Sequence, residues 1–478
     1  MSTFFDHPIY EIVGRAADQI GVQAYAVGGV VRDYFLQRHC TDIDFVCVGD
    51  GIALAKAAAE LVGRHTEVHV FKNFGTASFH YRHGDENWEI EFVGARKESY
   101  RSNSRKPLVT SGTLEDDQNR RDFTINAMAI NVNGCSRESS VEERLIDPFG
   151  GIQDLNRGII RTPLEPGITF SDDPLRMMRA IRFASQLGFA IEPTTFEAIR
   201  QYAERIKIVS AERIATELNK IILSPVPSVG LKLLLDSGLL QLIFPDLARM
   251  KGVETVGQRG HKDNFYHTLK VVDNVSQKST DLWLRWAAVL HDIGKPACKR
   301  WVDGIGWTFH GHEAKGSHMV KRIFTSLKLP LDAKMKYVEK LVLLHMRPIV
   351  LAEDIVTDSA VRRLLFEAGE DIDDLMTLSE ADITSRNEAK VRRYLDNFQL
   401  VRRKLQELEE KDHIRNFQPP ISGEDIMQTF DLKPCREIGT IKDAIKEAIL
   451  EGIIPNEREA AYQMMLAEAA KLGLKPVK

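Results

Sequence analysis

The stretch Tyr25–Gly49, YAVGGVVRDYFLQRHCTDIDFVCVG, decides the fold of the first part of the chain. A short apolar run meets the pair Gly28-Gly29, and helical spacing follows over Val30–Leu36. A second apolar run occupies Ile43–Val48. This order predicts a strand, a glycine turn, a helix and a second strand.

Two carboxylates, Asp42 and Asp44, stand at the entry of the second predicted strand. Alternate side chains of a strand share a face, so these two point the same way, about 7 Å apart. Carboxylates placed in this way can hold hard cations such as Mg²⁺. The backbone at Gly28 and Gly29 can approach a polyphosphate, and Arg32 follows one helical turn later. An isolated pair of aspartates is more often solvated, but the joint pattern favours phosphoryl transfer.

The composition of the 478-residue chain, 43% hydrophobic and 28% charged, is that of a globular protein with two to four domains. No apolar run of about 18 residues predicts a membrane span, and the first residues do not resemble a signal peptide. Five scattered cysteines suit a reducing cytoplasm. The net charge of −4 does not exclude an RNA partner, because arginine is concentrated in Arg96–Arg121 and Arg157–Arg213.

The remainder of the head has the pattern of a small mixed sheet with helices. Helices are expected over residues 1–22 and 51–62, and strands over 66–71, 76–82 and 88–93. Glu89 and Glu91 share a strand face, so either could be a third carboxylate beside the aspartate pair, with Glu89 slightly favoured, or both could be solvated. The polar stretch Arg96–Asn119 is expected to be a long mobile loop.

Two further motifs follow the head strands. In Arg120–Ala127, RRDFTINA, a guanidinium at Arg121 suits a triphosphate or sugar, and the Asn126 amide can both donate and accept. Ser171–Phe183, SDDPLRMMRAIRF, has the signals of a capped helix start. Four side chains are expected on one face of that helix, the last with some drift, opposite a buried Met and Ile set: Asp173, Arg176, Arg179 and Arg182.

A second cluster of histidine and aspartate begins near His261. Its members lie in helical contexts around the sequence HDIGKP: His267, His291, Asp292 and Asp382, with His312 and His345 between them. Such a mixed nitrogen and oxygen set suits Mn, Fe, Ni, Co or Mg. The two additional histidines would permit a second metal ion.

The joint motifs GGVVRD with TDID, RRDFTINAMA and the Asp–Arg helix resemble the polymerase beta-like nucleotidyltransferases. Within them they resemble the class II branch, the CCA-adding tRNA nucleotidyltransferases and bacterial poly(A) polymerases. The HDIGKP region looks like an HD domain, a metal-dependent phosphohydrolase bundle. The resemblance implies an α/β head with a mixed sheet followed by all-α regions. Its expected divisions are a head at 1–150, a neck at 151–225, a helical region at 226–395 with the HD domain at about 261–390, and a tRNA-binding tail at 396–478.

The resemblance also implies an activity, the template-independent addition of CCA to tRNA 3′ ends from CTP and ATP. Asp42 and Asp44 would hold two Mg²⁺ ions, and Gly28, Gly29, Arg32 and Arg121 would bind the triphosphate. Asp173 and Arg176 would read the base, with Arg179 and Arg182 in support. The glutamate that precedes this aspartate in the family is Asp172 here. In these enzymes a flexible loop at the position of Arg96–Asn119 is needed for the final A, and its length here is unlike that of CC-only enzymes.

Several alternatives remain open. A poly(A) polymerase or an A-adding enzyme shares the head motifs. An HD phosphohydrolase with a regulatory head is disfavoured by the base-reading helix, and a non-catalytic RNA-binding protein is disfavoured by the intact aspartate pair. The HD domain could also persist only as a scaffold. The sequence leaves the oligomeric state open.

Overall fold

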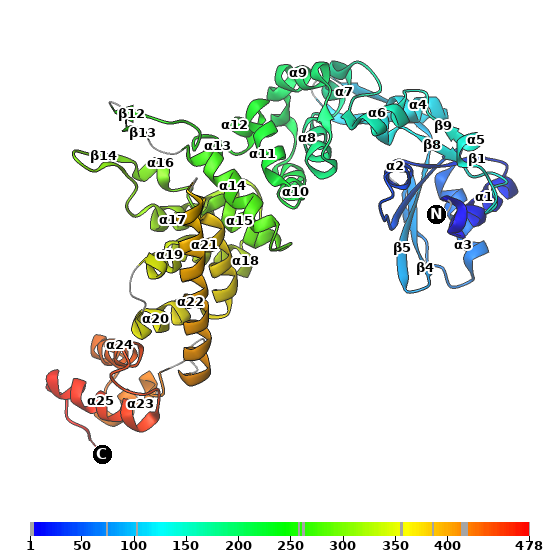
Figure 1. Cartoon of the computed structure of the whole chain (residues 1–478). Coiled ribbons are helices and arrows are strands. Elements are labelled where there is room, and N and C mark those ends of the chain that lie inside the picture. The colour runs from blue at the N-terminus through cyan, green and yellow to red at the C-terminus, as the bar shows by residue number, and fades with distance from the viewer. Residues whose placement is uncertain are drawn as a thin grey trace. The chain divides into compact units, whose positions relative to one another are not determined.

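The computed structural model describes residues 4–72, 75–101, 104–256, 259–260, 263–353, 357–384, 387–412 and 419–477. The chain divides into two compact units, Met1–Phe244 and Pro245–Lys478. The first contains a mixed sheet followed by helices, and the second is helical apart from two short hairpins (Figure 1). The predicted fold class, an α/β head followed by all-α regions, is confirmed.

A seven-stranded sheet forms the head, in the order β3-β4-β5-β2-β1-β8-β9. Its pairs are antiparallel except for β2 and β5, which run parallel and place the aspartate strand at the centre. The strands are β1 (Gln23–Val27), β2 (Asp42–Val48), β3 (His69–Phe71), β4 (Thr76–His83), β5 (Glu86–Gly94), β8 (Ala129–Asn131) and β9 (Leu145–Ile146).

One face of this sheet is covered by helices. The helix α3 (Gly51–Val62) packs on β4 and β5, and α1 (Ile9–Ile20) packs on α3 and β1. Beneath them the alternation of the strands buries an aromatic core, in which the rings of Phe45 and Phe79 lie 5.5 and 5.3 Å from that of Phe92. The residues between them, including the acidic ones, therefore point to the opposite face.

The expectation of a long mobile loop over Arg96–Asn119 is wrong for the described residues. Strands β6 (Arg96–Arg101) and β7 (Ser104–Ser111) pair as a ribbon outside the main sheet, and α4 (Leu114–Asn119) follows with a Thr113 capping box. Positions 102–103 of the expected loop lie outside the described residues. The sequences of the two strands, RKESYR and SRKPLVTS, lack the apolar alternation that signals a strand.

The helices of the first unit continue beyond the head. They are α2 (Gly29–Phe35), α5 (Val141–Arg144), α6 (Gly151–Arg157), α7 (Pro166–Asp172), α8 (Leu175–Leu187), α9 (Pro193–Tyr202), α10 (Ala211–Ile222), α11 (Pro227–Asp236) and α12 (Leu239–Ile243). Short 3₁₀ segments lie at Phe4–Asp6, Thr124–Asn126 and Ala203–Ile208, and β10 (Ile159–Ile160) pairs with β11 (Ala190–Ile191).

The helix start predicted within Ser171–Phe183 lies at the proline of that stretch, so Asp173 precedes the helix instead of lying on its face. Ser171 and Asp172 end α7, Asp173 is extended with φ −133° and ψ 100°, and α8 begins at Leu175. A proline disfavours the helical conformation in the residue before it, so Pro174 separates the two helices. The buried side predicted for this helix is confirmed, since Met177, Met178 and Ile181 are fully buried.

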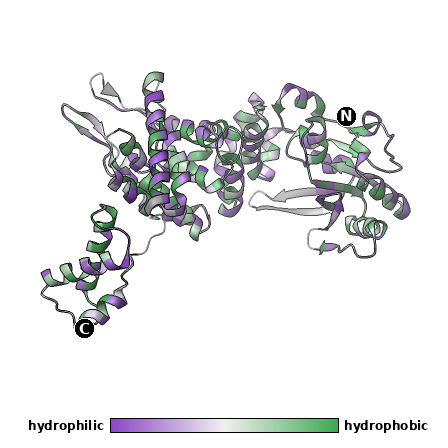
Figure 2. Cartoon of the chain, turned by 60° about the horizontal axis from the view of Figure 1, so that its bottom comes forward, coloured by the Kyte–Doolittle hydropathy of each residue, from purple (hydrophilic) through white to green (hydrophobic). Residues whose placement is uncertain are grey.

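The second unit is a set of amphipathic helices, with apolar and polar residues on each (Figure 2). They are α13 (Pro245–Ala248), α14 (Asn264–Ser276), α15 (Leu282–Leu290), α16 (Lys295–Cys298), α17 (His312–Ser326), α18 (Ala333–Leu344), α19 (Met346–Glu353), α20 (Asp358–Ala368), α21 (Ile372–Asp382), α22 (Glu388–Asp412), α23 (Gly423–Phe430), α24 (Arg436–Leu450) and α25 (Arg458–Lys471). A 3₁₀ turn lies at Gly369–Asp371, and the hairpins are β12 (Thr255–Val256) with β13 (Arg259–Gly260) and β14 (Arg300–Val302) with β15 (Gly306–Thr308). His261 lies outside the described residues.

Candidate active site of the head and candidate metal centre of the helical unit

Four carboxylates gather on the face of the head sheet opposite α3, beside a buried apolar cluster that packs with Leu114 of α4. The parallel register sets Asp42 opposite Glu89 and Asp44 opposite Glu91. Burial raises the pKa of Asp44, the Arg121 guanidinium opposes this, and the charges of Asp42 and Glu89 raise it further. Partial burial and the nearby charges of Asp44 and Glu89 also raise the pKa of Glu91. This crowding of negative charge is the arrangement that a bound cation would relieve.

The glycine turn lies directly beside these carboxylates. Gly28 has φ +75°, and a Cβ there would lie 3.1 Å from Arg121 Nη1 and 3.5 Å from Asp44 Oδ2. A side chain is therefore disfavoured both by conformation and by space. The buried carboxylate of Asp117 accepts from Arg120 Nε at 2.9 Å and from Arg121 Nε at 3.0 Å. Asp117 thus holds a pair of guanidinium groups beside Asp44.

Arg32 has a different environment from the one expected of a phosphate ligand. Its Nε and Nη2 each donate to Asp33 at 2.9 Å, and its Nη1 donates to Asn126 Oδ1 at 2.9 Å. Asn126 Nδ2 in turn donates to Asp122 at 3.0 Å. Arg32 therefore links α2 to the RRDFTINA segment, and its role toward a triphosphate stays a prediction.

Asp122 connects this segment to the helix α8. It accepts from Arg179 Nε at 2.7 Å. Burial raises the pKa of Asp122, but the Arg179 guanidinium and the Asn126 amide outweigh this and lower it to about 2. Arg179 is consequently held by the protein itself, as the expected supporting role requires.

The two expected base-reading side chains lie at the start of α8. Asp173 Oδ1 accepts from the Leu175 amide at 3.2 Å, and Asp173 Oδ2 lies 3.7 Å from Arg213 on α10. Arg176 Nη2 donates to the carbonyl of Arg120 at 2.5 Å. The backbone of the RRDFTINA segment therefore positions Arg176.

Arg182, the fourth expected residue, is buried near Arg179, and both guanidinium groups lie over the Phe183 ring. Its Nε donates to Glu217 on α10 at 2.6 Å and its Nη1 donates to Gln186 at 3.2 Å. It joins two helices of the neck and does not line the cavity.

One open cavity of about 330 Å³ unites the carboxylates with the helix α8. Asp44 and Glu91 lie at its floor of strands, and Asp173 lies at the start of α8. Of the twelve lining residues six are arginine and four are acidic: Asp44, Thr76, Glu91, Val93, Arg96, Arg120, Arg121, Asp122, Asp173, Arg176, Arg179 and Arg213. Such a cavity offers donors for a polyphosphate next to carboxylates for a metal ion.

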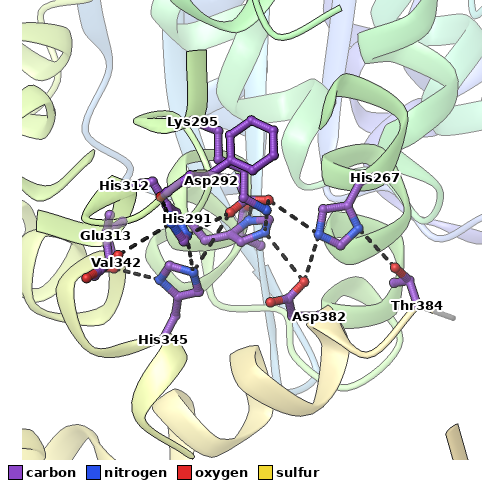
Figure 3. A network of polar contacts seen from close by, with 12 residues as sticks. His267, His291, Asp292, Lys295, His312, Glu313, Val342, His345, Asp382 and Thr384 are labelled. Carbon is purple, nitrogen blue, oxygen red and sulfur yellow. Dashed lines mark hydrogen bonds and ion pairs between the residues drawn. The ribbon is translucent and has the colours of Figure 1, made fainter. Parts of the chain in front are cut away.

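The second candidate centre brings together all six histidine and aspartate residues named from the sequence (Figure 3). Asp292 lies between two groups: its Oδ2 is 3.4 Å from His267 Nε2 and its Oδ1 is 3.3 Å from His312 Nε2. Within the described part of the chain, two sets of three ligand atoms lie within 4.8 Å of one another, His267, His291 and Asp292, and Asp292, His312 and His345. Asp382 Oδ1 approaches the first set, at 2.7 Å from His267 Nε2.

The ring orientations in this centre suit metal ligands. The Nδ1 atoms of His291, His312 and His345 lie 2.7, 2.9 and 2.7 Å from backbone carbonyls, which makes each Nδ1 the donor and leaves Nε2 with its lone pair. His291 Nε2 and Asp292 Oδ1 are buried without a hydrogen-bond partner among the described residues.

Two groups of the centre have pKa values that favour the forms that bind metal, whereas burial of His291 is outweighed by the charge of Asp292, which raises the pKa of His291. Burial lowers the pKa of His345 to about 4, so its imidazole is neutral. Burial raises the pKa of Asp292, but His291 and Lys295 hold it well below the usual range, so the carboxylate is ionised. Neutral imidazole and ionised carboxylate are the forms that bind metal.

Comparison with known proteins identifies the parts of the chain. Residues 24–161 match the poly A polymerase head domain, 188–251 a probable RNA and SrmB-binding site of polymerase A, and 264–387 the HD domain. The A-adding tRNA nucleotidyltransferase of Deinococcus radiodurans is 33% identical, over 91% of this chain and 94% of its own. The chain belongs to the tRNA nucleotidyltransferase family.

Two further relatives of this tRNA nucleotidyltransferase family support the assignment. The multifunctional CCA protein of Pseudomonas fluorescens is 31% identical over 66% of this chain and 72% of its own. The CCA-adding enzyme of Bacillus stearothermophilus in complex with CTP has the same fold, with a TM-score of 0.67 at 24% identity, covering 98% of this chain and 99% of its own. Membership makes the protein an enzyme of the nucleotidyltransferase class. None of the described helices is long and apolar enough to cross a membrane.

Sequence reasoning missed several residues of both sites. In the tRNA nucleotidyltransferase head these are Asp117 and Arg120, which hold Arg121 and Arg176, and Arg213 beside Asp173. Arg120 could have been found from the sequence, because it stands next to Arg121 in the RRD motif. No sequence pattern connects Arg213 to Asp173, because the two lie far apart in the chain. In the HD centre Lys295 Nζ donates to Asp292 at 2.6 Å, and Thr384 Oγ1 lies 2.9 Å from His267 Nδ1.

Proposed function

We propose that this protein adds CCA to tRNA 3′ ends from CTP and ATP. The observation that carries the proposal is the single cavity in which Asp44 and Arg121 of the head meet Asp173 and Arg176 of the neck. A reaction centre and a base reader in one cavity can select nucleotides without a nucleic-acid template. The family membership and the tRNA and CTP named for relatives support the same conclusion.

Asp42 and Asp44 would hold two Mg²⁺ ions in this reaction. The fit rests on the oxygen donors on one sheet face and on the raised pKa of Asp44, which a cation would relieve. When bound, such a pair activates the 3′-hydroxyl and stabilises the leaving pyrophosphate. Arg121, fixed by Asp117 beside Gly28, would bind the triphosphate. Arg32 would contribute mainly by holding Asn126.

The base would be read by Asp173 and Arg176. Cytosine and adenine both present an amino donor beside a ring-nitrogen acceptor on the Watson–Crick edge, which a carboxylate and a guanidinium complement. Uracil and guanine reverse that order and leave the charged groups unpaired, which costs several kcal/mol in a desolvated pocket. The hydrogen bond from Arg176 to the Arg120 carbonyl keeps the guanidinium in place for this contact.

One experiment tests the activity. tRNA ending before CCA, at C or at CC is incubated with each single nucleoside triphosphate. CCA addition predicts C incorporation on the first two substrates and A incorporation on the third. A long run of A would instead indicate a poly(A) polymerase. No incorporation on any of the three would overturn the proposal.

A second candidate function is addition of the terminal A alone. The observation that favours it is the similarity to the A-adding enzyme of Deinococcus radiodurans across 91% of this chain, whereas the Pseudomonas fluorescens CCA protein matches 66%. In the same experiment an A-adding enzyme incorporates A on the substrate ending at CC and incorporates no C on the other two. This outcome would replace CCA addition by A addition and keep the roles of Asp42 and Asp44.

For the second centre we propose metal-dependent phosphohydrolysis. His267, His291, Asp292 and Asp382 would hold one divalent ion, and His312 and His345 with Asp292 a second. The orphaned His291 Nε2 and Asp292 Oδ1 support the fit. When bound, the metal supplies a nucleophilic hydroxide at neutral pH, and Lys295 would orient Asp292. Metal content and hydrolysis of bis-p-nitrophenyl phosphate test this, because a metal-loaded but inactive protein would indicate a scaffold.

The free thiols of the five cysteines support a cytoplasmic location.

A further inference from the structure

The carboxylate face of the head sheet extends beyond the carboxylates onto β4 and β3. The antiparallel register sets His80 opposite Glu89, Ser78 opposite Glu91 and Arg82 opposite Asn87. Residues opposite one another share a face, so His80 and Arg82 lie on the same side of the sheet as Asp42. This face therefore continues from the candidate metal site across β5 to β4 (Figure 1).

The outer part of this face is exposed and carries one arginine and two histidines. His80 and Arg82 are exposed, as is His69, which stands opposite Ser78 on β3. Within the described residues, no hydrogen bond or ion pair joins His80 or Arg82 to another side chain. The same strands are covered by α3 on their other face. One face is thus packed against α3, while the outer part of the other carries the exposed Arg82 guanidinium and two exposed imidazoles near four carboxylates.

The position of the arginine-rich cavity fixes the direction from which a second substrate can approach. The cavity is lined by Asp44 and Glu91, but Asp42, Glu89 and His80 lie outside its lining. On the other side of β2, the turn that follows β1 brings Gly28 next to Arg121 and Asp44. A nucleotide in the cavity leaves Asp42 accessible from the direction of β5 and β4.

We propose that His80 and Arg82, with His69 beside them, form a track for the backbone of the RNA strand whose 3′ end is extended. The proposal rests on the function proposed for Asp42 and Asp44. An RNA strand ending at Asp42 passes over Glu89 and Glu91, whose charges repel its phosphates. On the next strand, about 5 Å beyond Glu89, the Arg82 guanidinium offsets that repulsion, and the exposed His80 imidazole can donate a hydrogen bond to a phosphodiester oxygen. His80 and Arg82 are positioning residues, because they would act on the reaction only by holding the RNA backbone.

The test is steady-state kinetics of nucleotide addition with varied tRNA and varied triphosphate. His80→Ala combined with Arg82→Ala is expected to raise KM for tRNA about tenfold, with KM for the triphosphate unchanged. The slope of log binding affinity against log salt should become shallower by about 0.7 for each phosphate that the variant no longer neutralises. Arg82→Lys should restore most of the affinity, because binding a phosphate needs mainly charge.

His83→Ala is the matched control, because His83 is an exposed histidine of the same strand on the opposite face. It should leave both KM values unchanged. Equal effects of the double variant and of His83→Ala on KM for tRNA, or an unchanged KM for tRNA in the double variant, would overturn the track. A rise in KM for the triphosphate alone would also overturn it. Failure of the unsubstituted protein to extend any tRNA would instead overturn the function on which the track rests.

Discussion

At the scale of single residues, Asp173 and Arg176 carry the proposed choice of nucleotide. Neither forms a hydrogen bond with the other side chain in the described structure, although both line the cavity. Arg176 is held by a backbone carbonyl, and Asp173 is near Arg213 at 3.7 Å. Their polar edges are therefore oriented by the protein before a base binds, which reduces the cost of binding it.

Changing Asp173 to Ala should relax base discrimination before it removes chemistry. Use of CTP and ATP should lose about 2–4 kcal/mol of transition-state stabilisation, because Arg176 loses its partner in the base contact. UTP and GTP should lose much less, since they gain nothing from that carboxylate. Competition among the four triphosphates on a tRNA lacking CCA measures this. Equal losses for all four would show that Asp173 serves only the fold.

Substitutions in the aspartate pair should reduce the use of CTP and of ATP alike, without a change in base preference. Asp42→Ala or Asp44→Ala should lower incorporation of CTP and of ATP by at least about 10³-fold, because either change removes a ligand of the proposed metal pair. Binding of tRNA should change little. Single-turnover incorporation and a filter-binding assay separate the two effects. Asp85→Ala, at the exposed tip of the β4–β5 hairpin, is the control. Substantial residual activity in either active-site variant would contradict the assignment.

At the scale of elements, the helices α8 and α10 are joined by a buried ion pair. The side chains of Arg182 and Glu217 are 10% and 5% exposed, with Nε and Oε2 2.6 Å apart. Burial lowers the pKa of Arg182, and the charge of Glu217 opposes this. The pair therefore fixes the helix that carries Arg176 and Arg179, although neither of its members faces the cavity.

Glu217→Ala should lower the free energy of unfolding by about 3–5 kcal/mol, because it leaves the Arg182 charge buried and unpaired. Replacing both members, Arg182→Met with Glu217→Leu, should restore much of the loss. Urea unfolding followed by circular dichroism measures both. The exposed pair Arg200 and Glu197, 3.5 Å apart, provides a control, whose removal should cost less than about 1 kcal/mol. A small effect at Glu217 would show that water reaches Arg182.

At the scale of the whole molecule, the two candidate centres lie in different compact units. The carboxylates and the cavity belong to Met1–Phe244, and the HD cluster belongs to Pro245–Lys478. The chemistry of the two centres also differs, because one has oxygen ligands only and the other has mainly imidazole. We therefore expect them to work independently.

His291→Ala together with Asp292→Ala should abolish bound metal in the second unit and any phosphohydrolase activity. Nucleotide addition should stay within about twofold, since no residue of the cavity lies in that unit. Metal content by plasma mass spectrometry and the two assays on one preparation check this. His318→Ala, an exposed histidine of α17, is the control. A parallel loss of nucleotide addition with an unchanged melting temperature would show that the centres are coupled.

The sequence by itself determined the features that depend only on residues close to one another along the chain. The alternation around Asp42 and Asp44, the glycine turn at Gly28 and the HDIGKP helix end are local patterns, and the structure has the strands and helices that they predict. Local capping also marks α4, where Thr113 and Asp116 are a helix signal inside the stretch expected to be a loop.

Only the tertiary structure decided which distant residues meet. Arg32, expected from the sequence to bind a triphosphate, instead donates a hydrogen bond to Asn126, 94 positions away. Arg182 donates to Glu217, 35 positions away. Asp292 lies at the centre of the second cluster because the ends of α15, α18 and α21 come together around it. Buried charged groups need partners, and the fold determines which partners are within reach.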